Sequence, residues 1–463
     1  MIKRRLKSLV VIIALVFCIQ CPWQRLKKGD HEKATAKADD SRASAADVRR
    51  GFLHAWQGYK DHARGHDSLK PLSKSYSDWY EEPLLMTPVD ALDTMIIMGL
   101  DDEAKEAKKL ILGNLSFDKD MKVQHFEITI RVLGGLISAY QLDGDKRLLE
   151  LAVDLADRML PVFDSPTGMP YRYVNLKTGK TSGRVSSPAE IGTCLVEYGA
   201  LSKLTGNPVY YKKAKKAVTA LYEERSRLGL VGTAIDVETG FWLIRDAHVG
   251  GGIDSYYEYL LKCWHLFGDR DCKAMWEDSI NAINEHLADE SNGRLWYGHA
   301  GMSTGIRTGT VFGALYAFFP GVLALDGDLE RAARLQESSH RMWTLHGIEP
   351  EALDYRRMKV IYGAYPLRPE IIESAYYLYY YTSEDKYRRM GYVYWNSIEE
   401  HCKTEAGYAG ISDVRTMKKR DAMESYFLAE TMKYFYLLFA PPDTLDLEKT
   451  VFNTEAHPVT RTW

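Results

Sequence analysis

Apolar residues recur at spacings of three and four along most of the chain after about Ala46, which predicts a long succession of helices. Short Gly-Asp turns separate these helices, as at Gly144-Asp145 and Gly268-Asp269. The recurrent unit is therefore a helix, a turn and a second helix, which is typical of stacked helical hairpins. The segments with the strongest helical spacing are 128–142, 148–160, 191–204 and 255–267.

Residues 46–440 contain no long flexible linker and no abrupt change of composition. Roughly 400 residues at about 30 per helix and loop predict on the order of a dozen or more helices. We therefore expect one domain over residues 47–460, built as a closed ring whose loops line a central cleft. An open solenoid of hairpins is the structural alternative.

The N-terminus has the features of an export signal. Four basic residues lie within the first seven positions and precede an apolar run at 9–19. Such a run is shorter than the roughly 20 apolar residues that span a bilayer. We predict a signal peptide at 1–22, a polar linker at 23–46, and an exported protein of the periplasm or cell surface. Cys18 and Cys21 are candidate lipid-attachment sites, with a simple cleaved peptide as an equal alternative.

Composition excludes little but directs the search. The net charge of -3 provides no basic surface for nucleic acid, so no nucleic-acid partner is expected. The 30 Tyr and 10 Trp offer apolar faces with polar edges, which suit a sugar-binding cleft or a large helical core. No nucleophile elbow, phosphate-binding glycine loop, dinucleotide fingerprint or EF-hand loop occurs, and His457 is expected to be a hydrogen-bonded structural group.

Four cysteines follow the leader, at Cys194, Cys263, Cys272 and Cys402, without the paired spacing of a zinc site. An exported protein can form disulfides, but a fold of this size does not depend on them. We expect one bridge at most. Cys263 and Cys272 are the nearest pair, although their spacing leaves the connectivity open.

The first acidic motif contains Glu127 and Arg131, which are four residues apart and therefore share a helix face. An exposed ion pair of this kind contributes well under about 1 kcal/mol. Because the neighbouring residues are almost all apolar, we expect the pair to lie in a cleft.

The second motif places Asp254 after three glycines and before a cluster of tyrosines. Glycines allow a close approach of the backbone, and the tyrosines favour a sugar site. Asp254 is equally well placed to be an ordinary helix N-cap, so both interpretations remain open.

The third motif contains Arg368, Pro369, Glu370 and Glu373. Pro369 suits the first position of a helix, which would put Glu370 in the first turn, where the helix dipole favours an ionised carboxylate. An ionised carboxylate is what a general base requires. Glu373, three residues further on, shares the same face.

Three further carboxylates are weaker candidates. Glu351 follows a proline, as Glu370 does, and Glu430 precedes an apolar stretch that should lie in the core and needs a polar partner there. Glu455 lies in the terminal segment 451–458, whose apolar character indicates a tail folded back into the protein. Thr454 beside it offers two oxygen ligands for a hard cation.

Together these blocks resemble glycoside hydrolase family 47, the class I α-mannosidases. The likeness extends from about Ala55 to Pro458, and its specificity lies in eight motifs that occur in the right order. The additional motifs are Ala55-Trp56-Gln57-Gly58-Tyr59, Gly65-His66-Asp67 and Asp90-Ala91-Leu92-Asp93-Thr94.

The resemblance implies an all-α fold, an (α/α)7 barrel plugged by a C-terminal β-hairpin, with Ca²⁺ as the cofactor. It implies that Thr454 binds the calcium ion directly through its hydroxyl and carbonyl oxygens. Waters held by carboxylates that include Glu373, Glu430 and Glu455 would complete the coordination shell.

The resemblance also assigns the chemistry, which inverts the anomeric configuration. Glu127 is then the general acid, acting through a water, Glu370 the base on the attacking water, and Asp254 an essential third carboxylate. Inverting enzymes generally hold two carboxyl groups about 6.5–9.5 Å apart. The remaining polar residues of the blocks are expected to bind substrate: Arg131, Glu351, Arg368, Glu373, Tyr426, Glu430 and Glu455.

One stretch departs from the processing mannosidases of this family. They carry a His ahead of a Cys-Phe-Leu-Pro-Gly motif, where this chain has the segment 314–321 without a His. That form resembles the endoplasmic-reticulum degradation-enhancing mannosidase-like branch, and Tyr426 occupies a position where many relatives have Phe. The basic leader and the lack of extra domains indicate an exported bacterial member.

The sequence therefore predicts a calcium-dependent, inverting exo-α-mannosidase that removes terminal α-1,2-linked mannose, acting as a monomer with a candidate lipid anchor. A non-catalytic mannose-binding protein on the same scaffold is the alternative from a different class. A purely structural helical ring explains the acidic groups beside glycines and aromatics least well.

Overall fold

The computed structural model describes residues 43–463, which form one compact unit. The predicted signal peptide, the candidate lipid sites Cys18 and Cys21 and most of the predicted linker lie outside the described residues. Helix α1 (Ala45–His62) begins two residues inside the predicted linker, because the Ser44 hydroxyl caps it by accepting a hydrogen bond from the Asp47 amide.

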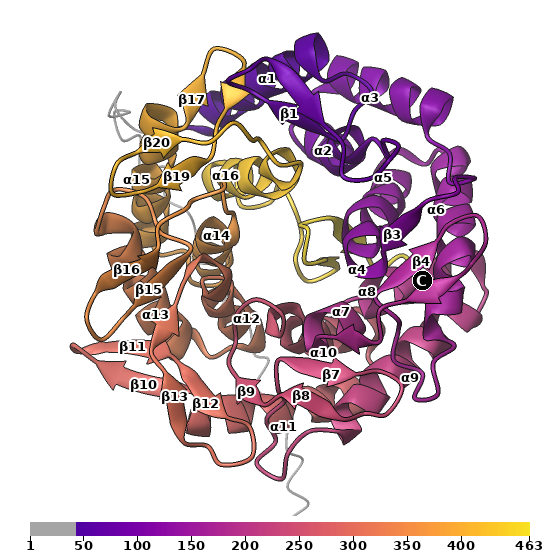
Figure 1. Ribbon diagram of the computed structural model, residues 1–463. Helices are drawn as coiled ribbons and strands as arrows, with labels where there is room; N and C mark the ends of the chain where they lie inside the picture. The colour runs from indigo at the N-terminus through magenta and orange to yellow at the C-terminus, as the bar shows by residue number, and fades with distance from the viewer. Residues whose placement is uncertain (1–42) are drawn as a thin grey trace, which may run out of the picture. The chain divides into compact units, whose positions relative to one another are not determined.

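Within residues 43–463 the long helices form two concentric layers (Figure 1). The inner helices are apolar on nearly every side and are buried, whereas the outer helices carry one apolar stripe that packs inward. The inner layer comprises α2 (Met86–Ile97), α5 (Gly134–Asp143), α8 (Leu195–Thr205), α10 (Asp254–Phe267), α12 (Phe319–Asp326), α14 (Glu370–Thr382) and α16 (Met432–Phe439). The outer layer comprises α1, α3 (Asp101–Asn114), α6 (Lys146–Met159), α9 (Val209–Glu223), α11 (Arg270–His286), α13 (Leu329–Thr344) and α15 (Asp385–His401).

The last inner helix closes the ring. Helix α16 packs on α14 before it and on α1 at the beginning of the described chain, and the π-helical turn that precedes α16, at Phe427–Thr431, packs on α2. Each inner helix also pairs with the outer helix next to it in sequence. The structure is therefore the predicted (α/α)7 barrel, and the open solenoid is excluded. No helix within residues 43–463 has the length and apolar character needed to cross a bilayer.

Turn glycines end several of the predicted helices. Gly144, Gly206, Gly268 and Gly327 each follow an inner helix with a positive φ between 68° and 94°, the conformation that glycine adopts without strain. Of the four predicted segments, 191–204 differs most, because α7 (Pro188–Gly192) ends before α8 begins. The segment 128–142 contains a π-helical turn at Thr129–Leu133 between α4 (His125–Ile128) and α5.

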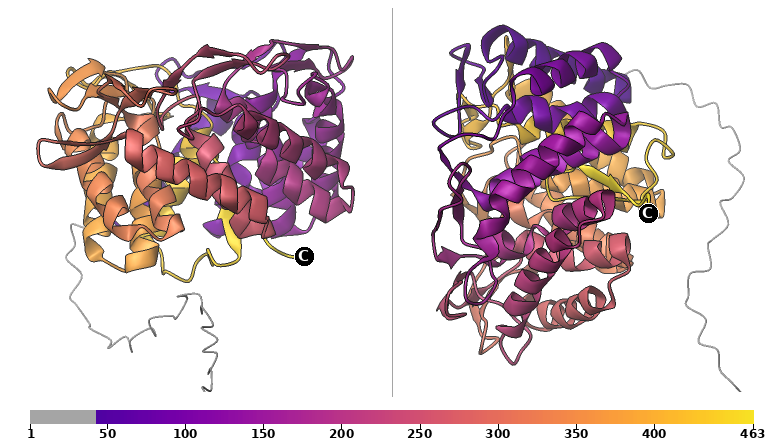
Figure 2. Two further views of the ribbon diagram at one scale, coloured as in Figure 1. Left: turned by 90° about the horizontal axis from the view of Figure 1, so that it is seen from below. Right: turned by 90° about the vertical axis from the view of Figure 1, so that its right-hand side faces the viewer.

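Short antiparallel strands, which the helical spacing did not predict, fill the loops at one end of the ring (Figure 2). Strands of two to four residues are too short to display an alternating pattern in the sequence. They are β1 (Ser68–Lys70), β2 (Ser75–Ser77), β3 (Lys122–Gln124), β4 (Tyr173–Asn175), β5 (Thr181–Ser182), β6 (Val185–Ser186), β7 (Ala234–Asp236), β8 (Trp242–Ile244), β9 (Asp246–Ala247), β10 (Ala288–Ser291), β11 (Arg294–Tyr297), β12 (His299–Gly301), β13 (Arg307–Gly309), β14 (Val311–Phe312), β15 (Ala352–Asp354), β16 (Lys359–Tyr362), β17 (Lys403–Thr404), β18 (Gly407–Tyr408), β19 (Ile411–Asp413) and β20 (Lys418–Lys419).

The tail forms the predicted hairpin, with β21 (Thr450–Phe452) antiparallel to β22 (Pro458–Thr460). It enters the ring from the end opposite the short strands and contacts α5 and α10 (Figure 2). Buried charges hold its turn. Lys433 lies 2.8 Å from Asp93 and donates a hydrogen bond to the Ala456 carbonyl, and His457 Nδ1 lies 2.7 Å from Asp93 Oδ2. His457 is therefore the hydrogen-bonded structural group that was predicted.

The charge of His457 makes the hairpin sensitive to alkaline pH. Burial alone would lower the pKa of His457, but Asp93 and Asp90 beside it raise that pKa to about 9. A raised histidine pKa contributes stability that is complete below the unfolded value of about 6.5 and is lost as pH rises through about 9. We predict a loss of roughly 3 kcal/mol in the free energy of unfolding across this window, measured by denaturant titration at each pH.

The control is His457→Gln, which removes the titrating group and should be much less sensitive between pH 6.5 and 9. An imidazole signal that is missing from the variant should titrate near pH 9 in the NMR spectrum of the unaltered protein. Equal pH dependence in both proteins would contradict the assignment.

Candidate active site

One cavity of about 390 Å³ inside the ring contains ten of the eleven predicted site residues in its wall. Three of its acidic groups, Asp254, Glu370 and Glu373, lie in the first turns of α10 and α14, where the unpaired amides favour negative charge. Glu351 is the exception and does not line the cavity. The ten lining residues are Glu127, Arg131, Asp254, Arg368, Glu370, Glu373, Tyr426, Glu430, Thr454 and Glu455.

Arg131 links the wall of the ring to the tail. Its Nε lies 3.0 Å from Glu127 Oε2, and its terminal nitrogen pairs with the Glu455 carboxylate. The guanidinium carbon lies 5.0 Å from the ring centre of Trp79 and 5.6 Å from that of Tyr426. Because Arg131 is only 7% exposed, the interpretation of an exposed ion pair is wrong.

Asp254 is presented by a closely packed loop. The Gly250 carbonyl accepts hydrogen bonds from the amides of Ile253 and Asp254, while the Tyr316 ring packs against the Gly250 backbone. A Cβ at Gly250 would lie 2.1 Å from a ring carbon of Tyr316, so only glycine fits there. Ile253 is the N-cap of α10, so the N-cap interpretation of Asp254 is wrong. Burial raises the pKa of Asp254 to about 7, and Glu258 and Glu370 add to the effect.

A hydrogen-bonded chain supports Tyr316 from behind. The Tyr316 hydroxyl lies 2.6 Å from His299 Nε2, and His299 Nδ1 lies 2.5 Å from Asp246 Oδ2. His248 lies beside this chain and accepts a hydrogen bond from the Gly250 amide at 3.1 Å. Since these groups already satisfy one another, they act as a brace for the loop that carries Asp254.

Helix α14 begins at Glu370, and Pro369 is its N-cap. The sequence analysis placed Pro369 at the first helical position, so the helix begins one residue later than predicted. Burial raises the pKa of Glu370 to about 7, although Arg368 acts in the opposite direction. Burial thus opposes the helix dipole that was expected to keep this group ionised. One Glu370 oxygen is buried without a hydrogen-bond partner among the described residues and is therefore open to a ligand.

The carboxylates of Glu373, Glu430 and Glu455 line the cavity together and outnumber the cationic side chain beside them, Arg131. Burial raises the pKa of Glu373 to about 8, with a further contribution from Glu258. Burial and then Glu455 raise the pKa of Glu430 well above its usual value, and burial raises the pKa of Glu455 to about 8 against the effect of Arg131. Such a group of oxygen ligands favours a hard divalent cation.

Thr454 lies in the hairpin turn and lines the same cavity as this acidic group. Its amide donates a hydrogen bond to the Tyr259 hydroxyl at 3.1 Å. The Asn453 side chain fixes the turn from inside: its oxygen accepts hydrogen bonds from the Glu455 and His457 amides, and its nitrogen donates to the Ile130 carbonyl at 2.8 Å. The position of the turn is therefore fixed by α10 and by the π-helical turn at Thr129–Leu133.

Glu351 acts behind the cavity wall. Its carboxylate accepts hydrogen bonds from Arg368 at 2.5 and 3.0 Å and so directs that guanidinium. Arg368 in turn lies 5.7 Å from the ring centre of Tyr426, whose hydroxyl donates to the Pro366 carbonyl at 2.6 Å. The Tyr426 ring is consequently held next to both Arg131 and Arg368 at the cavity surface.

Two carboxylates in the cavity wall were missed by the sequence analysis. Glu258 follows Asp254 by one helical turn and pairs with the buried Lys262, so its helix-face spacing was a usable signal. Glu190 lies in the first turn of α7, two residues after Pro188, and accepts a hydrogen bond from Gln124 at 2.7 Å.

Comparisons with known proteins find similar sequences over most of the chain and a solved structure with a similar fold. The family model for glycosyl hydrolase family 47 matches residues 51–461. Alpha-mannosidase I MNS4 of Arabidopsis thaliana is 39% identical over an alignment of 449 residues that covers 92% of this chain and 71% of the relative. ER degradation-enhancing alpha-mannosidase-like protein 2 of Homo sapiens is 38% identical, with 89% of this chain and 76% of the relative covered. The solved alpha-1,2-mannosidase from Trichoderma reesei has a TM-score of 0.83 at 29% identity, covering 90% of this chain and 98% of that one.

Removal of the Arg131 guanidinium should destabilise the whole structure. In Arg131→Met the Glu455 carboxylate stays buried without its main cation, which costs about 3–5 kcal/mol in the free energy of unfolding. Urea denaturation of both proteins measures the loss. Arg147→Met, which breaks an exposed pair with Asp145, is the matched control and should leave the urea midpoint unchanged. Equal midpoints for the unaltered protein and Arg131→Met would refute the structural role of Arg131.

Proposed function

The chain belongs to glycosyl hydrolase family 47 and is a glycoside hydrolase, and on that premise we propose that it is a calcium-dependent, inverting exo-α-mannosidase. The proposed substrate is terminal α-1,2-linked mannose on mannose-rich oligosaccharides, as the names of the relatives suggest. The observation that carries the proposal is the convergence of Glu127, Asp254, Glu370 and Thr454 on one cavity from four distant parts of the chain.

The donor set fits the proposed calcium ion. Thr454 supplies a hydroxyl and a carbonyl oxygen, and Glu373, Glu430 and Glu455 supply buried carboxylates to hold its water ligands. All of these are oxygen ligands, which calcium prefers. Burial raises the pKa values of the three carboxylates, and neighbouring carboxylates add to the effect, so a bound cation would favour their ionised forms. When bound, the cation would supply positive charge that keeps these carboxylates ionised and that orients the hydroxyl groups of a bound sugar.

The proposed base is Glu370. It lies at a helix start in a cavity wall, has a free carboxylate oxygen, and has a pKa of about 7, so it accepts a proton readily at neutral pH. We assign Glu127 as the acid through an intervening water, because Arg131 holds it on another part of the same wall. We assign to Asp254, which lines the same cavity, the orientation of the reacting sugar or water.

The remaining wall suits a pyranose ring. Tyr426 offers an aromatic face, and Leu315 and Phe318 add apolar surface from the segment that departs from the processing mannosidases. Arg368 is the hydrogen-bond donor we assign to sugar hydroxyls, with Glu351 directing it from behind. We infer that Glu351 positions a substrate-binding group and does not itself touch the sugar.

We also propose that the protein is exported by its basic apolar leader, to the periplasm or cell surface of a bacterium, as a monomer. Cys21, or Cys18, is the proposed point of lipid attachment. Metabolic labelling with a fatty-acid analogue tests this: Cys21→Ser and Cys18→Ser identify the residue, and label retained in the double variant would refute it.

Glu370→Gln should lower turnover by about 10²–10⁴-fold, because glutamine cannot accept the proton of the attacking water. Mannobiose binding, measured by calorimetry, should persist, since glutamine has nearly the same shape. Glu290→Gln, at an exposed position of strand β10, is the matched control and should hydrolyse at the normal rate. Normal turnover in Glu370→Gln would remove the base assignment.

Proton NMR of α-1,2-linked mannobiose hydrolysis tests the function as a whole. The first mannose released should be the β-anomer, as inversion requires, and a chelator should stop its release until calcium is restored. Binding without any released mannose would favour the non-catalytic alternative. Undiminished activity after complete calcium removal would overturn the metal assignment.

A further inference from the structure

Two cysteines lie together in a part of the ring that the proposed reaction does not use. Cys263 stands in the last turns of α10 and Cys272 in the first turn of α11, on either side of the Gly268-Asp269 turn. Both side chains are buried, and their sulfur atoms lie within 4.8 Å of each other. The other two cysteines among residues 43–463, Cys194 and Cys402, belong to no such group of three or more potential metal ligands.

The groups around the two sulfurs favour covalent pairing over a metal ion. Asp269, the third member of the group, already accepts hydrogen bonds from the Asp271 and Cys272 amides and from Lys215 at 2.5 Å. Lys215 Nζ also lies 3.4 Å from Cys272 Sγ. A second cation next to this ammonium group would be repelled, and a zinc ion would lack a free fourth ligand.

We propose that Cys263 and Cys272 form a disulfide that joins the inner helix α10 to the outer helix α11. The oxidant is a second disulfide, either a small molecule such as oxidised glutathione or an oxidoreductase of the exported compartment. The proposal does not depend on the hydrolase reaction.

The surroundings identify Cys272 as the attacking sulfur. Its thiolate would have the Lys215 ammonium group and the N-terminus of α11 beside it. It attacks one sulfur of the oxidant and releases the other as a thiolate. The Cys263 thiolate then attacks the Cys272 sulfur of the mixed disulfide and expels the second thiolate. Two protons leave the cysteines, and the oxidant gains two electrons.

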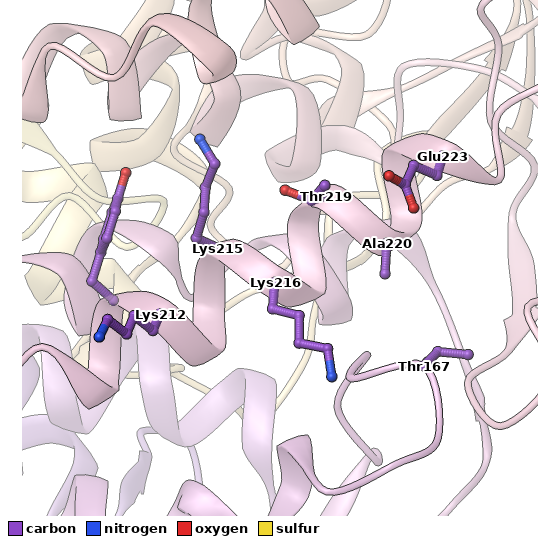
Figure 3. Close-up of a pocket in the computed structure, with 8 residues that line it drawn as sticks. Thr167, Lys212, Lys215, Lys216, Thr219, Ala220 and Glu223 are labelled. Atoms are coloured by element: carbon purple, nitrogen blue, oxygen red, sulfur yellow. The ribbon is translucent and has the colours of Figure 1, made fainter.

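A surface cavity of about 470 Å³ provides the approach. Tyr211 and Lys215 belong to its wall, and both also contact the cysteine pair: the Tyr211 hydroxyl lies 3.6 Å from Cys263 Sγ. Figure 3 shows Lys215 and Lys216 leaving α9 in different directions, so only the former can reach the sulfurs. A small disulfide bound in this cavity would lie next to Lys215, which contacts Cys272.

The bond would stabilise the helix that carries the site. Helix α10 begins with Asp254 and contains Tyr259, whose hydroxyl accepts the hydrogen bond from the Thr454 amide. A cross-link limits the freedom of the unfolded chain, so the melting temperature should fall by a few degrees on reduction.

Tryptic mapping of the full chain after exposure to oxidised glutathione tests the proposal. Cleavage after Lys262, Arg270 and Lys273 places the two cysteines in separate peptides, 263–270 and 271–273. These peptides should be recovered joined, and a reductant should separate them. Recovery of both cysteines as individually alkylated thiols would overturn the proposal, as would zinc bound in equal amount to intact thiols.

Variants test the order of attack. Cys263→Ser should accumulate a mixed disulfide between Cys272 and glutathione, faster than Cys272→Ser accumulates one at Cys263. Lys215→Gln should slow bond formation, and Lys216→Gln is the matched control that should not. Equal rates in both lysine variants would remove Lys215 from the mechanism.

Discussion

The insertion of a charged hairpin turn into the ring is the constraint on which the rest of the structure depends. Asp93 holds the fully buried Lys433 and His457, and Arg131 holds Glu455, both of which are nearly buried. Buried charges are tolerated only where their partners stand in place, so the turn has one acceptable position. That position puts Thr454 into the cavity lined by the N-terminal ends of the inner helices.

The same cavity gathers more negative charge than the protein balances. Asp254, Glu370 and Glu373 come from inner helices, and Glu430 and Glu455 approach from the closing helix and the tail. Arg131 and Arg368 offset part of this charge, while burial, with a smaller contribution from neighbouring carboxylates, raises the pKa values of Asp254, Glu370 and Glu455. An ion bound at the hairpin tip would supply the missing charge, which connects the closure of the fold to the proposed hydrolysis.

The sequence predicted the ring because helical periodicity and glycine turns are local properties, which can be recognised without knowledge of distant contacts. It predicted Glu127, Asp254 and Glu370 as candidates because each stands in an unusual local context. It could not show that burial opposes the helix dipole at Glu370, or that Glu351 stops behind Arg368, because both depend on neighbours distant in sequence. The short strands were not predicted, because segments of two to four residues are too short to show the alternating apolar and polar pattern of a strand.

A crystal structure of the protein grown with calcium and a non-hydrolysable mannose analogue would test the central claim most directly. The account predicts an ion bonded to the hydroxyl and carbonyl oxygens of Thr454 at about 2.3–2.6 Å, with the sugar between it and the acidic wall. An ion bound elsewhere, or a hairpin turn that leaves Thr454 outside the cavity, would contradict the account.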